Sequence, residues 1–285
     1  MSKRRYGLDE AKIQAYIKEG RGQGVGRDYK PWINIHDFPS QGRVSRCLSW
    51  KTGRIHHFLS DSETRYFYLL EWSDCIIDIR EQYPILDRDR TQKIAEEKGI
   101  KYPEDVTTKT PLILTTDFLI TVRQAGKTFN VARTIKPSRD LEKSRTIEKF
   151  EIEKTYWEEQ GIDWSIVTEK EISRELASNI EWVHDANKLE PTADLDTPSL
   201  MKLVDILKER LSSNSTIMLK NLLYDLDTEF NYDDGLFLYL LKHLIATKQV
   251  MINSMDRKFN INQPVGDLLL INSNSAALEK EKIAQ

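Results

Sequence analysis

Three residues of this 285-residue chain have the side-chain types that cut a phosphodiester bond: Glu63, Asp117 and Lys136. Such a hydrolysis is accelerated by a cation that stabilises the charged transition state and lowers the pKa of the attacking water. Magnesium does this while bound to one or two protein carboxylates, with water in its other positions. A nearby lysine adds positive charge and can orient or deprotonate the water. The chemistry that these residue types suggest is therefore metal-dependent hydrolysis.

Two runs of strand character place Asp117 and Lys136 on one face of a predicted hairpin. LILTTDFLITVR and TFNVARTIKP flank a turn at Ala125 and Gly126. In that register Asp117 lies opposite Thr134, and Lys136, two residues further on, projects from the same face. A carboxylate among apolar strand residues is costly unless something there uses it. Taken as a pair, however, Asp117 and Lys136 can equally form a cross-strand ion pair.

Glu63 lies in the first turn of a predicted helix just ahead of the sheet. The run SDSETRYFYLLEW offers Ser60 as the N-cap and Glu63 three residues later, which is a capping-box arrangement. The helix dipole also favours a carboxylate at this position. Read alone, Glu63 can be a simple capping residue. The order of a helix Glu, a strand Asp and a strand Lys is more specific than any one of the three.

The elements around these residues alternate between helix and strand. Periodicity predicts helices over residues 8–19, 60–72, 91–99 and 138–160, a hairpin over 44–60, and strands over 75–85 and 163–169. This order predicts an α/β domain over residues 1–170, built on one mixed sheet flanked by helices. The glycines of GRGQGVGRDY follow a helix rather than a strand, which excludes a dinucleotide-binding loop.

The remainder of the chain has a different pattern. Residues 171–198 are predicted to be a connecting helix and linker, and residues 199–285 a winged helix-turn-helix domain. Three helical runs, SLMKLVDILKERL, STIMLKNLLYDLDTEF and DDGLFLYLLKHLIATK, precede a strand pair predicted in QVMINS and KFNIN. The third helix is mostly apolar and the region is acidic. Because DNA affinity needs several cations on one surface, this domain is expected to bind protein instead.

Charge is unevenly distributed along the chain. Residues 1–57 carry 12 Lys/Arg and 5 Asp/Glu, whereas the whole chain has a net charge of −3. A basic leading segment indicates contact with a polyanion, although ordinary solvated charge is the alternative. His56 and His57 are adjacent, so on a strand they point to opposite faces and do not share a metal ion. The residues predicted to contact the DNA backbone are Arg43, Arg46, Lys51, Arg54 and His56.

Neither a membrane span nor a disulfide is expected. The longest apolar run, residues 235–246, is interrupted by Lys242 and His243. It is far shorter than the ~20 residues that cross a membrane. Cys47 and Cys75 lack metal-type spacing and need no disulfide in a chain of this length, so a cytoplasmic location is expected. The basic N-terminus has no apolar core behind it, which argues against a secretory signal.

Seven stretches carry a family resemblance that spans nearly all of residues 12–183: IKEGRGQGVGRDYKPW, KTGRIHHFLSDSE, WSDCIIDIREQYP, TTDF, IKP, TIEKFEIEKTYW and TEKEISRELASNIEW. The chain resembles the PD-(D/E)xK nucleases and, within them, the TnsA endonuclease subunits of Tn-seven-like heteromeric transposases. This implies a restriction-endonuclease-like fold and catalysis by Glu63, Asp117 and Lys136. It also implies a Mg²⁺ site formed by Glu63, Asp117, Thr134 and the Ile135 carbonyl. The family has a Gln-type side chain where this chain has Thr134, and a shorter neutral hydroxyl puts a second ion in doubt.

The resemblance also implies a reaction and partners. The chain would cut the 5′ ends of a transposon in double-stranded DNA, a TnsB-like subunit would process the 3′ ends, and a TnsC-like ATPase would regulate both. One alternative is a free-standing restriction-like or repair nuclease. Another is a non-catalytic adaptor with a vestigial nuclease fold, which only Thr134 supports. On the long helix, Glu153 could support the metal ligands from behind, whereas Glu148 and Glu151 are expected in solvent.

Overall fold

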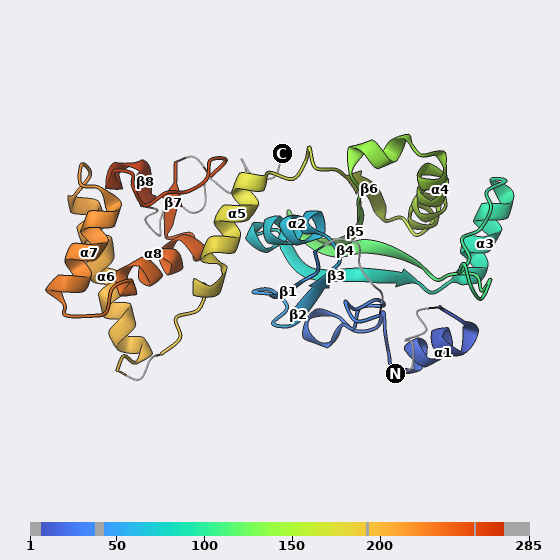
Figure 1. The fold of residues 1–285 in the computed structure, drawn as a ribbon, viewed down its shortest axis with the longest axis horizontal. Helices are drawn as coiled ribbons and strands as arrows, with labels where there is room; N and C mark the ends of the chain where they lie inside the picture. Colours follow the sequence, from blue (N-terminus) through green and yellow to red (C-terminus); the bar gives the residue numbers. More distant parts are fainter. Residues whose placement is uncertain (1–6, 38–42, 192–193, 254, 271–285) are drawn as a thin grey trace. The chain divides into compact units, whose positions relative to one another are not determined.

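The residues predicted to do chemistry lie on or beside a four-stranded sheet (Figure 1). The computed structural model describes residues 7–37, 43–191, 194–253 and 255–270, and it divides into two units between Ser173 and Arg174. The elements of the first unit are α1 (Glu10–Lys18), η1 (Gly26–Asp28), β1 (Ser45–Leu48), β2 (Ile55–Phe58), α2 (Asp61–Trp72), β3 (Ile76–Ile85), α3 (Arg88–Glu97), β4 (Leu114–Gln124), β5 (Lys127–Ile135), η2 (Ser138–Glu142), α4 (Ser144–Glu159) and β6 (Asp163–Val167).

The sheet is mixed and has the order β3-β4-β5-β6. β3, β4 and β5 are antiparallel neighbours, and β6 joins β5 in parallel. α4 packs against the sheet through Trp157, which is buried with Leu119 and Ala132 (Figure 1). These apolar contacts remove a large aromatic surface from water and fix α4 over the strands that carry the candidate site. A mixed sheet flanked by helices fits the predicted restriction-endonuclease-like fold.

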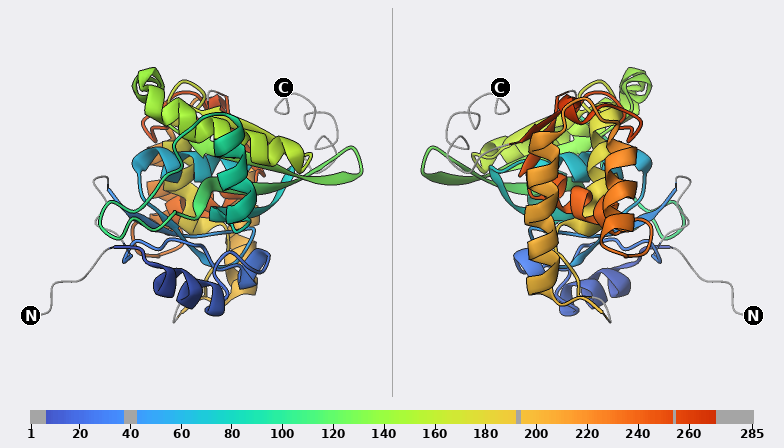
Figure 2. Two further views of the ribbon diagram at one scale, coloured as in Figure 1. Left: turned by 90° about the vertical axis from the view of Figure 1, so that its right-hand side faces the viewer. Right: turned by 90° about the vertical axis from the view of Figure 1, so that its left-hand side faces the viewer.

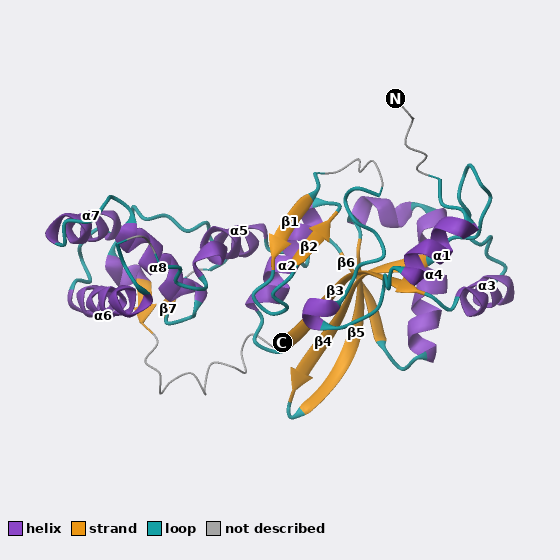
Figure 3. Ribbon diagram, turned by 90° about the horizontal axis from the view of Figure 1, so that it is seen from below, coloured by secondary structure: helices purple, strands orange, loops and turns teal. Residues whose placement is uncertain are grey.

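The β4–β5 hairpin has the predicted register. Its pairs run from Gln124 opposite Lys127 to Phe118 opposite Arg133. The turn residues Ala125 and Gly126 have φ of 48° and 75°, as the two-residue turn that matches the strand twist requires. The ladder ends one pair before Asp117 and Thr134, so the two strands separate at the candidate site. Its other end extends beyond the neighbouring strands (Figure 3).

The start of α2 confirms the predicted capping box. Ser60 Oγ accepts a hydrogen bond from the Glu63 N–H at 3.2 Å, and Glu63 Oε2 accepts one from the Leu59 N–H at 3.0 Å. The reciprocal pair satisfies N–H groups that a helix start otherwise leaves without partners.

The helix predicted over residues 138–160 is divided in two. Lys143 adopts an extended conformation between η2 and α4, with φ −83° and ψ 112°. The Ser138 N–H and hydroxyl both donate to Glu169, and these bonds hold the first turn apart from the helix that follows. The prediction of one continuous helix was therefore wrong at its first turn.

The second unit is mainly helical. Its elements are α5 (Arg174–Val183), η3 (His184–Ala186), α6 (Thr197–Ser213), α7 (Leu219–Glu229), α8 (Leu236–Ala246), β7 (Val250–Ile252), η4 (Val265–Asp267) and β8 (Leu268–Leu270). α8 lies at its centre, because α5, α6 and α7 all contact it. α5 buries Ile180 and Val183, so the helix predicted as a connector is part of this unit.

The strand pair predicted from QVMINS and KFNIN is only half correct. β7 pairs with β8, whereas the KFNIN run is not a strand. The Asn179 side chain explains this difference, because its amide donates to the carbonyls of Met255 and Arg257 and accepts from the Phe259 N–H. The bond to Phe259 occupies a backbone N–H that strand pairing would use, and the other two fix the residues just before the run.

Among the described residues, no helix combines the length and the apolar character that a membrane crossing requires. Among the described residues Cys47 and Cys75 are not joined in a disulfide, and their sulfur atoms lie against the hydroxyls of Tyr68 and Ser73.

Candidate active site

Asp117 lies where β4 and β5 separate. Its Oδ2 accepts a hydrogen bond from the backbone N–H of Ile135 at 2.7 Å. The Asp117 side chain thus takes the place of the next backbone pair of the hairpin, and it faces the end of β5. Lys136 follows directly, with its backbone N–H on the Val167 carbonyl of β6 at 3.0 Å. The strands hold Asp117 and the segment that carries Lys136 side by side.

Gln82 of β3 connects Asp117 with Glu63. Its Nε2 lies 3.3 Å from Asp117 Oδ1 and 3.4 Å from Glu63 Oε2. Gln82 is buried and has φ of 47°, in the left-handed region that side-chain-bearing residues rarely adopt. The strained backbone places one amide between two carboxylates. Gln82 was not among the residues predicted from the sequence, although three consecutive polar residues in the buried run IREQYPI were a signal.

Burial dominates the electrostatics of the two carboxylates. It raises the pKa of Glu63, and it raises the pKa of Asp117 well above its ordinary value. The charge of Glu63 raises the pKa of Asp117 further, while the Ile135 N–H and the Lys136 charge act in the opposite direction. A buried Glu63 and a half-buried Asp117 that repel each other favour either a proton or a cation between them.

A divalent cation fits this donor set. The two carboxylates approach a single donor atom, so their oxygens already face a common point. Within the described ranges no three His, Cys, Asp or Glu side chains gather closely enough to enclose a metal ion. Two carboxylates completed by water are the usual protein contribution to a Mg²⁺ site.

Thr134 and Glu153 form a polar cluster behind the two carboxylates. Glu153 of α4 is buried and its Oε1 accepts hydrogen bonds from Thr134 at 2.5 Å, Thr116 at 2.7 Å and the Trp164 indole at 2.9 Å. Burial raises the pKa of Glu153, and its charge contributes to the raised pKa of Asp117. The Thr134 hydroxyl is thus directed to Glu153. A role for Glu153 behind the site was suggested by the sequence, but its link to Thr134 was not.

Two residues predicted to contact DNA are instead part of the core. His56 is fully buried, with Nε2 2.9 Å from Thr52 Oγ1 and Nδ1 2.8 Å from Glu81 Oε2. The Arg54 guanidinium donates to both oxygens of Glu81 and to the carbonyls of Gly26 and Ile79. Glu81 is buried, so a cation beside it stabilises its charge. The prediction that Arg54 and His56 contact DNA phosphates is corrected, because both are used inside the protein.

The other three predicted DNA contacts have different surroundings. Arg46 is exposed on β1. Arg43 is exposed and forms an ion pair with Asp61 at 3.0 Å, and Lys51 donates to the Ser73 carbonyl at 2.7 Å. A hollow of 590 Å³ is lined by further basic residues of the leading segment, among them Arg27 and Lys30.

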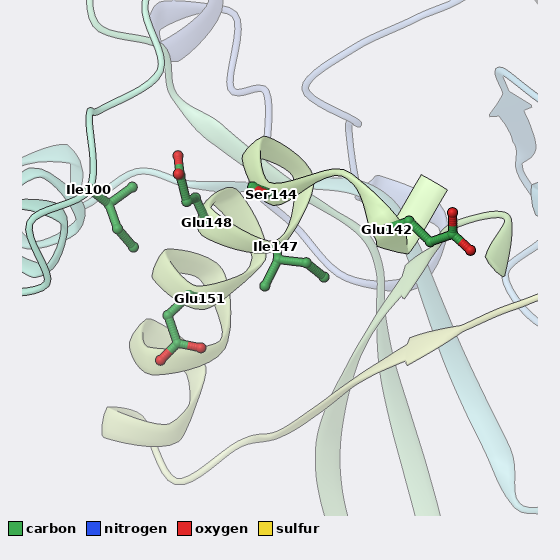
Figure 4. Close-up of a pocket in the computed structure, with 6 residues that line it drawn as sticks. All are labelled: Ile100, Glu142, Ser144, Ile147, Glu148 and Glu151. Carbon is green, nitrogen blue, oxygen red and sulfur yellow. The ribbon is translucent and has the colours of Figure 1, made fainter. Parts of the chain in front are cut away.

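A second hollow, on α4, has the wrong charge for DNA. It measures 430 Å³ and is lined by Glu142, Glu148, Glu151, Ser144 and two isoleucines, with no basic side chain (Figure 4). The carboxylates of Glu148 and Glu151 point apart in that view, and each forms a surface ion pair, with Arg145 and Lys98 respectively. Both glutamates are thus on the surface, as predicted.

Known proteins match most of the chain. Residues 73–169 match the family model described as TnsA-like endonuclease N terminal, and residues 171–253 match TnsA endonuclease C terminal. A curated relative, "Transposon Tn7 transposition protein TnsA" of Escherichia coli, is 41% identical over 229 residues, which cover 80% of this chain and 82% of that protein. The first model includes Gln82, Asp117 and Lys136, and the boundary between the two models lies close to the boundary between the two structural units.

Proposed function

The chain belongs to the TnsA family of transposon endonucleases, and from that premise we propose that it cuts the 5′ ends of a transposon by Mg²⁺-dependent phosphodiester hydrolysis. The single observation that carries the catalytic part is the convergence of Glu63 and Asp117 on the Gln82 amide. The proposed catalytic residues are Glu63, Asp117 and Lys136. The proposal applies to double-stranded DNA at transposon ends.

Glu63 and Asp117 would hold the metal through their carboxylate oxygens, with the Ile135 carbonyl as a further ligand. The bound ion would lower the pKa of a coordinated water and stabilise charge on the phosphate. The Gln82 amide would then hydrogen-bond those carboxylate oxygens that do not hold the metal. Thr134 would act indirectly, because its hydroxyl holds Glu153.

Lys136 would supply the remaining positive charge. It follows the Ile135 N–H that fixes Asp117, and its charge favours the ionised form of Asp117. An ammonium group there would stabilise the negative charge that builds up on the phosphate oxygens, and it could orient the attacking water. The exposed Arg43 and Arg46, together with Lys51, would hold the duplex by its phosphates without reading sequence.

The test is a cleavage assay on transposon-end DNA with Mg²⁺, with and without a TnsB-like subunit. We expect nicking at the 5′ ends only when both subunits are present. Metal chelation should stop nicking, and plain DNA should be spared.

Two other outcomes would identify other functions. Efficient cutting of plain DNA by the purified chain alone would favour a free-standing nuclease. If neither plain DNA nor transposon ends are cut under any condition, the nuclease proposal fails.

For the second unit we propose a winged-helix domain that binds the TnsC-like ATPase. Three helices followed by a two-stranded sheet support that architecture. α8 is largely buried rather than exposed to a DNA groove, and its His243 donates from Nδ1 to the Ala186 carbonyl at 2.8 Å. Large apolar side chains are exposed elsewhere on this unit, namely Met201, Met218 and Tyr224, and such exposure is common at protein contacts.

Removal of residues 174–285 should therefore abolish co-purification with the ATPase and spare the DNA complex formed with the TnsB-like subunit. Pull-down and gel-shift experiments on the same truncated chain measure the two effects. Tight, salt-sensitive binding of duplex DNA by the isolated second unit would contradict this assignment.

A further inference from the structure

The β4–β5 hairpin carries Asp117 and leads directly to Lys136, and beyond Asp117 it contains no acidic residue. Residues 118–139 contain five basic residues, Arg123, Lys127, Arg133, Lys136 and Arg139, and no Asp or Glu. The whole chain, in contrast, has a net charge of −3. A local absence of carboxylates in an acidic protein favours a polyanionic partner for this surface.

The end of this hairpin stands clear of the sheet. β3 pairs with β4 only as far as Val122, and β6 pairs with β5 only from Val131. Residues 123–130, which we call the hairpin arm, therefore have strand partners only within the β4–β5 hairpin, and at the base of the arm the Arg123 N–H donates to the Cys75 carbonyl at 2.7 Å. The arm projects from the first unit in two perpendicular views (Figures 2 and 3).

The arm presents cations beside an aromatic ring. Arg123 and Lys127 are exposed at its tip, whereas Arg133, nearer the core, is paired with Asp163. Phe129 lies opposite Val122 and is 43% exposed. An exposed ring on a strand without a covering element is costly in water, but it suits contact with nucleic acid, where apolar side chains meet base edges and sugars.

The length of the hairpin relates the arm to the candidate site. Seven residues separate Asp117 from Gln124, which corresponds to about 23 Å along a strand. At a rise of 3.4 Å per base pair this is roughly seven base pairs of duplex. We propose that the hairpin arm is a second DNA contact, which grips the phosphate backbone about seven base pairs from the bond that is cut. This inference rests on the proposed function, and it adds the position of the DNA duplex along the hairpin.

The first test removes charge from the arm. The variant Arg123→Gln/Lys127→Gln is compared with Lys93→Gln/Lys101→Gln, which loses the same charge from exposed positions on and just after α3. α3 follows the Ile85 end of β3, which is the end farther from the hairpin turn. Binding is measured to a duplex of roughly 40 base pairs, nearly four helical turns, by the full chain alone and with the TnsB-like subunit.

We expect the arm variant to bind the duplex about tenfold more weakly, and the slope of log affinity against log salt to fall by about 1.8. The α3 variant should keep the wild-type slope. Equal slopes for all three proteins would overturn the arm proposal. A wild type that neither binds nor cuts DNA would instead refute the proposed function, so the two failures are distinguishable.

A second test locates the arm on DNA. A photo-crosslinking phenylalanine analogue at position 129 should crosslink about four to six base pairs from the cut, because Phe129 lies opposite Val122, five residues or about 17 Å along the strand from Asp117. Crosslinks to a protein subunit alone would show that the arm docks on protein.

Discussion

Asp117→Ala should reduce metal-dependent strand cleavage by roughly 10³-fold or more, because it removes an oxygen ligand and leaves the metal with Glu63 as its remaining carboxylate. The fold should persist, since Asp117 lies beyond the end of the β4–β5 ladder and its main internal partner is one backbone N–H. Single-turnover cleavage of transposon-end DNA measures the effect, and circular dichroism checks the fold. Cutting at the wild-type rate would end the nuclease assignment.

The conservative variant Asp117→Asn separates metal binding from folding. A carboxyl whose pKa is raised in the folded state binds protons more tightly there than in the unfolded chain, so stability falls as pH rises through that raised pKa. Without metal, Asp117→Asn should therefore melt at a higher temperature than wild type near neutral pH, by about 2–4 °C for each kcal/mol of repulsion removed. This gain should disappear in acid, at a pH below the ordinary Asp pKa.

Added Mg²⁺ provides the matching readout. It should raise the melting temperature of wild type, because a ligand stabilises the state that binds it, and it should affect Asp117→Asn much less. An equal effect on both proteins would mean that the ion binds elsewhere.

Arg54→Met should lower the free energy of unfolding of the first unit by about 3–5 kcal/mol, because it leaves the buried charge of Glu81 without its guanidinium. Arg54 donates to both oxygens of Glu81, at 2.8 and 2.5 Å. Although burial alone would raise it, the charge of His56 and the hydrogen bonds from Arg54 hold the pKa of Glu81 below its ordinary value. Urea unfolding followed by fluorescence measures the loss.

Two controls define this effect. Adding Glu81→Gln to Arg54→Met should restore a large part of the lost stability, since the unpaired charge is then absent. Arg145→Met, which breaks an exposed ion pair with Glu148, should change stability by at most about 0.5 kcal/mol. A loss for Arg54→Met as small as that for Arg145→Met would show that the buried network contributes little.

The sequence predicted most of the first unit because its signals are local. The turn at Ala125 and Gly126 fixes the hairpin register, and the cap formed by Ser60 and Glu63 fixes the start of α2. Both depend on residues within four positions of each other. The predicted catalytic pair of Glu63 and Asp117 followed from these two elements, together with the family resemblance.

The errors arose where the conformation or the contacts of a residue depend on residues far away in the sequence. Gln82 reaches the carboxylates because its φ is positive, and no residue pattern indicates a left-handed glutamine. Arg54 and His56 have the pattern of surface cations on a short hairpin, but both contact Glu81, a buried carboxylate on β3. The partner of β7 was assigned to the nearest suitable run, whereas Asn179, far earlier in the chain, bonds the Phe259 N–H of that run and the carbonyls just before it.

The pleat of the hairpin limits how its reach can change. Successive side chains point to opposite faces of a strand, so one added residue in each strand would transfer Arg123 to the wrong face. Two added residues in each strand restore the orientation and lengthen the hairpin by about 6.6 Å, nearly the height of two base pairs. Relatives with longer or shorter hairpins can therefore vary this span only in discrete increments. Each increment also rotates the contact around the duplex, because two base pairs turn the DNA helix by about 70°.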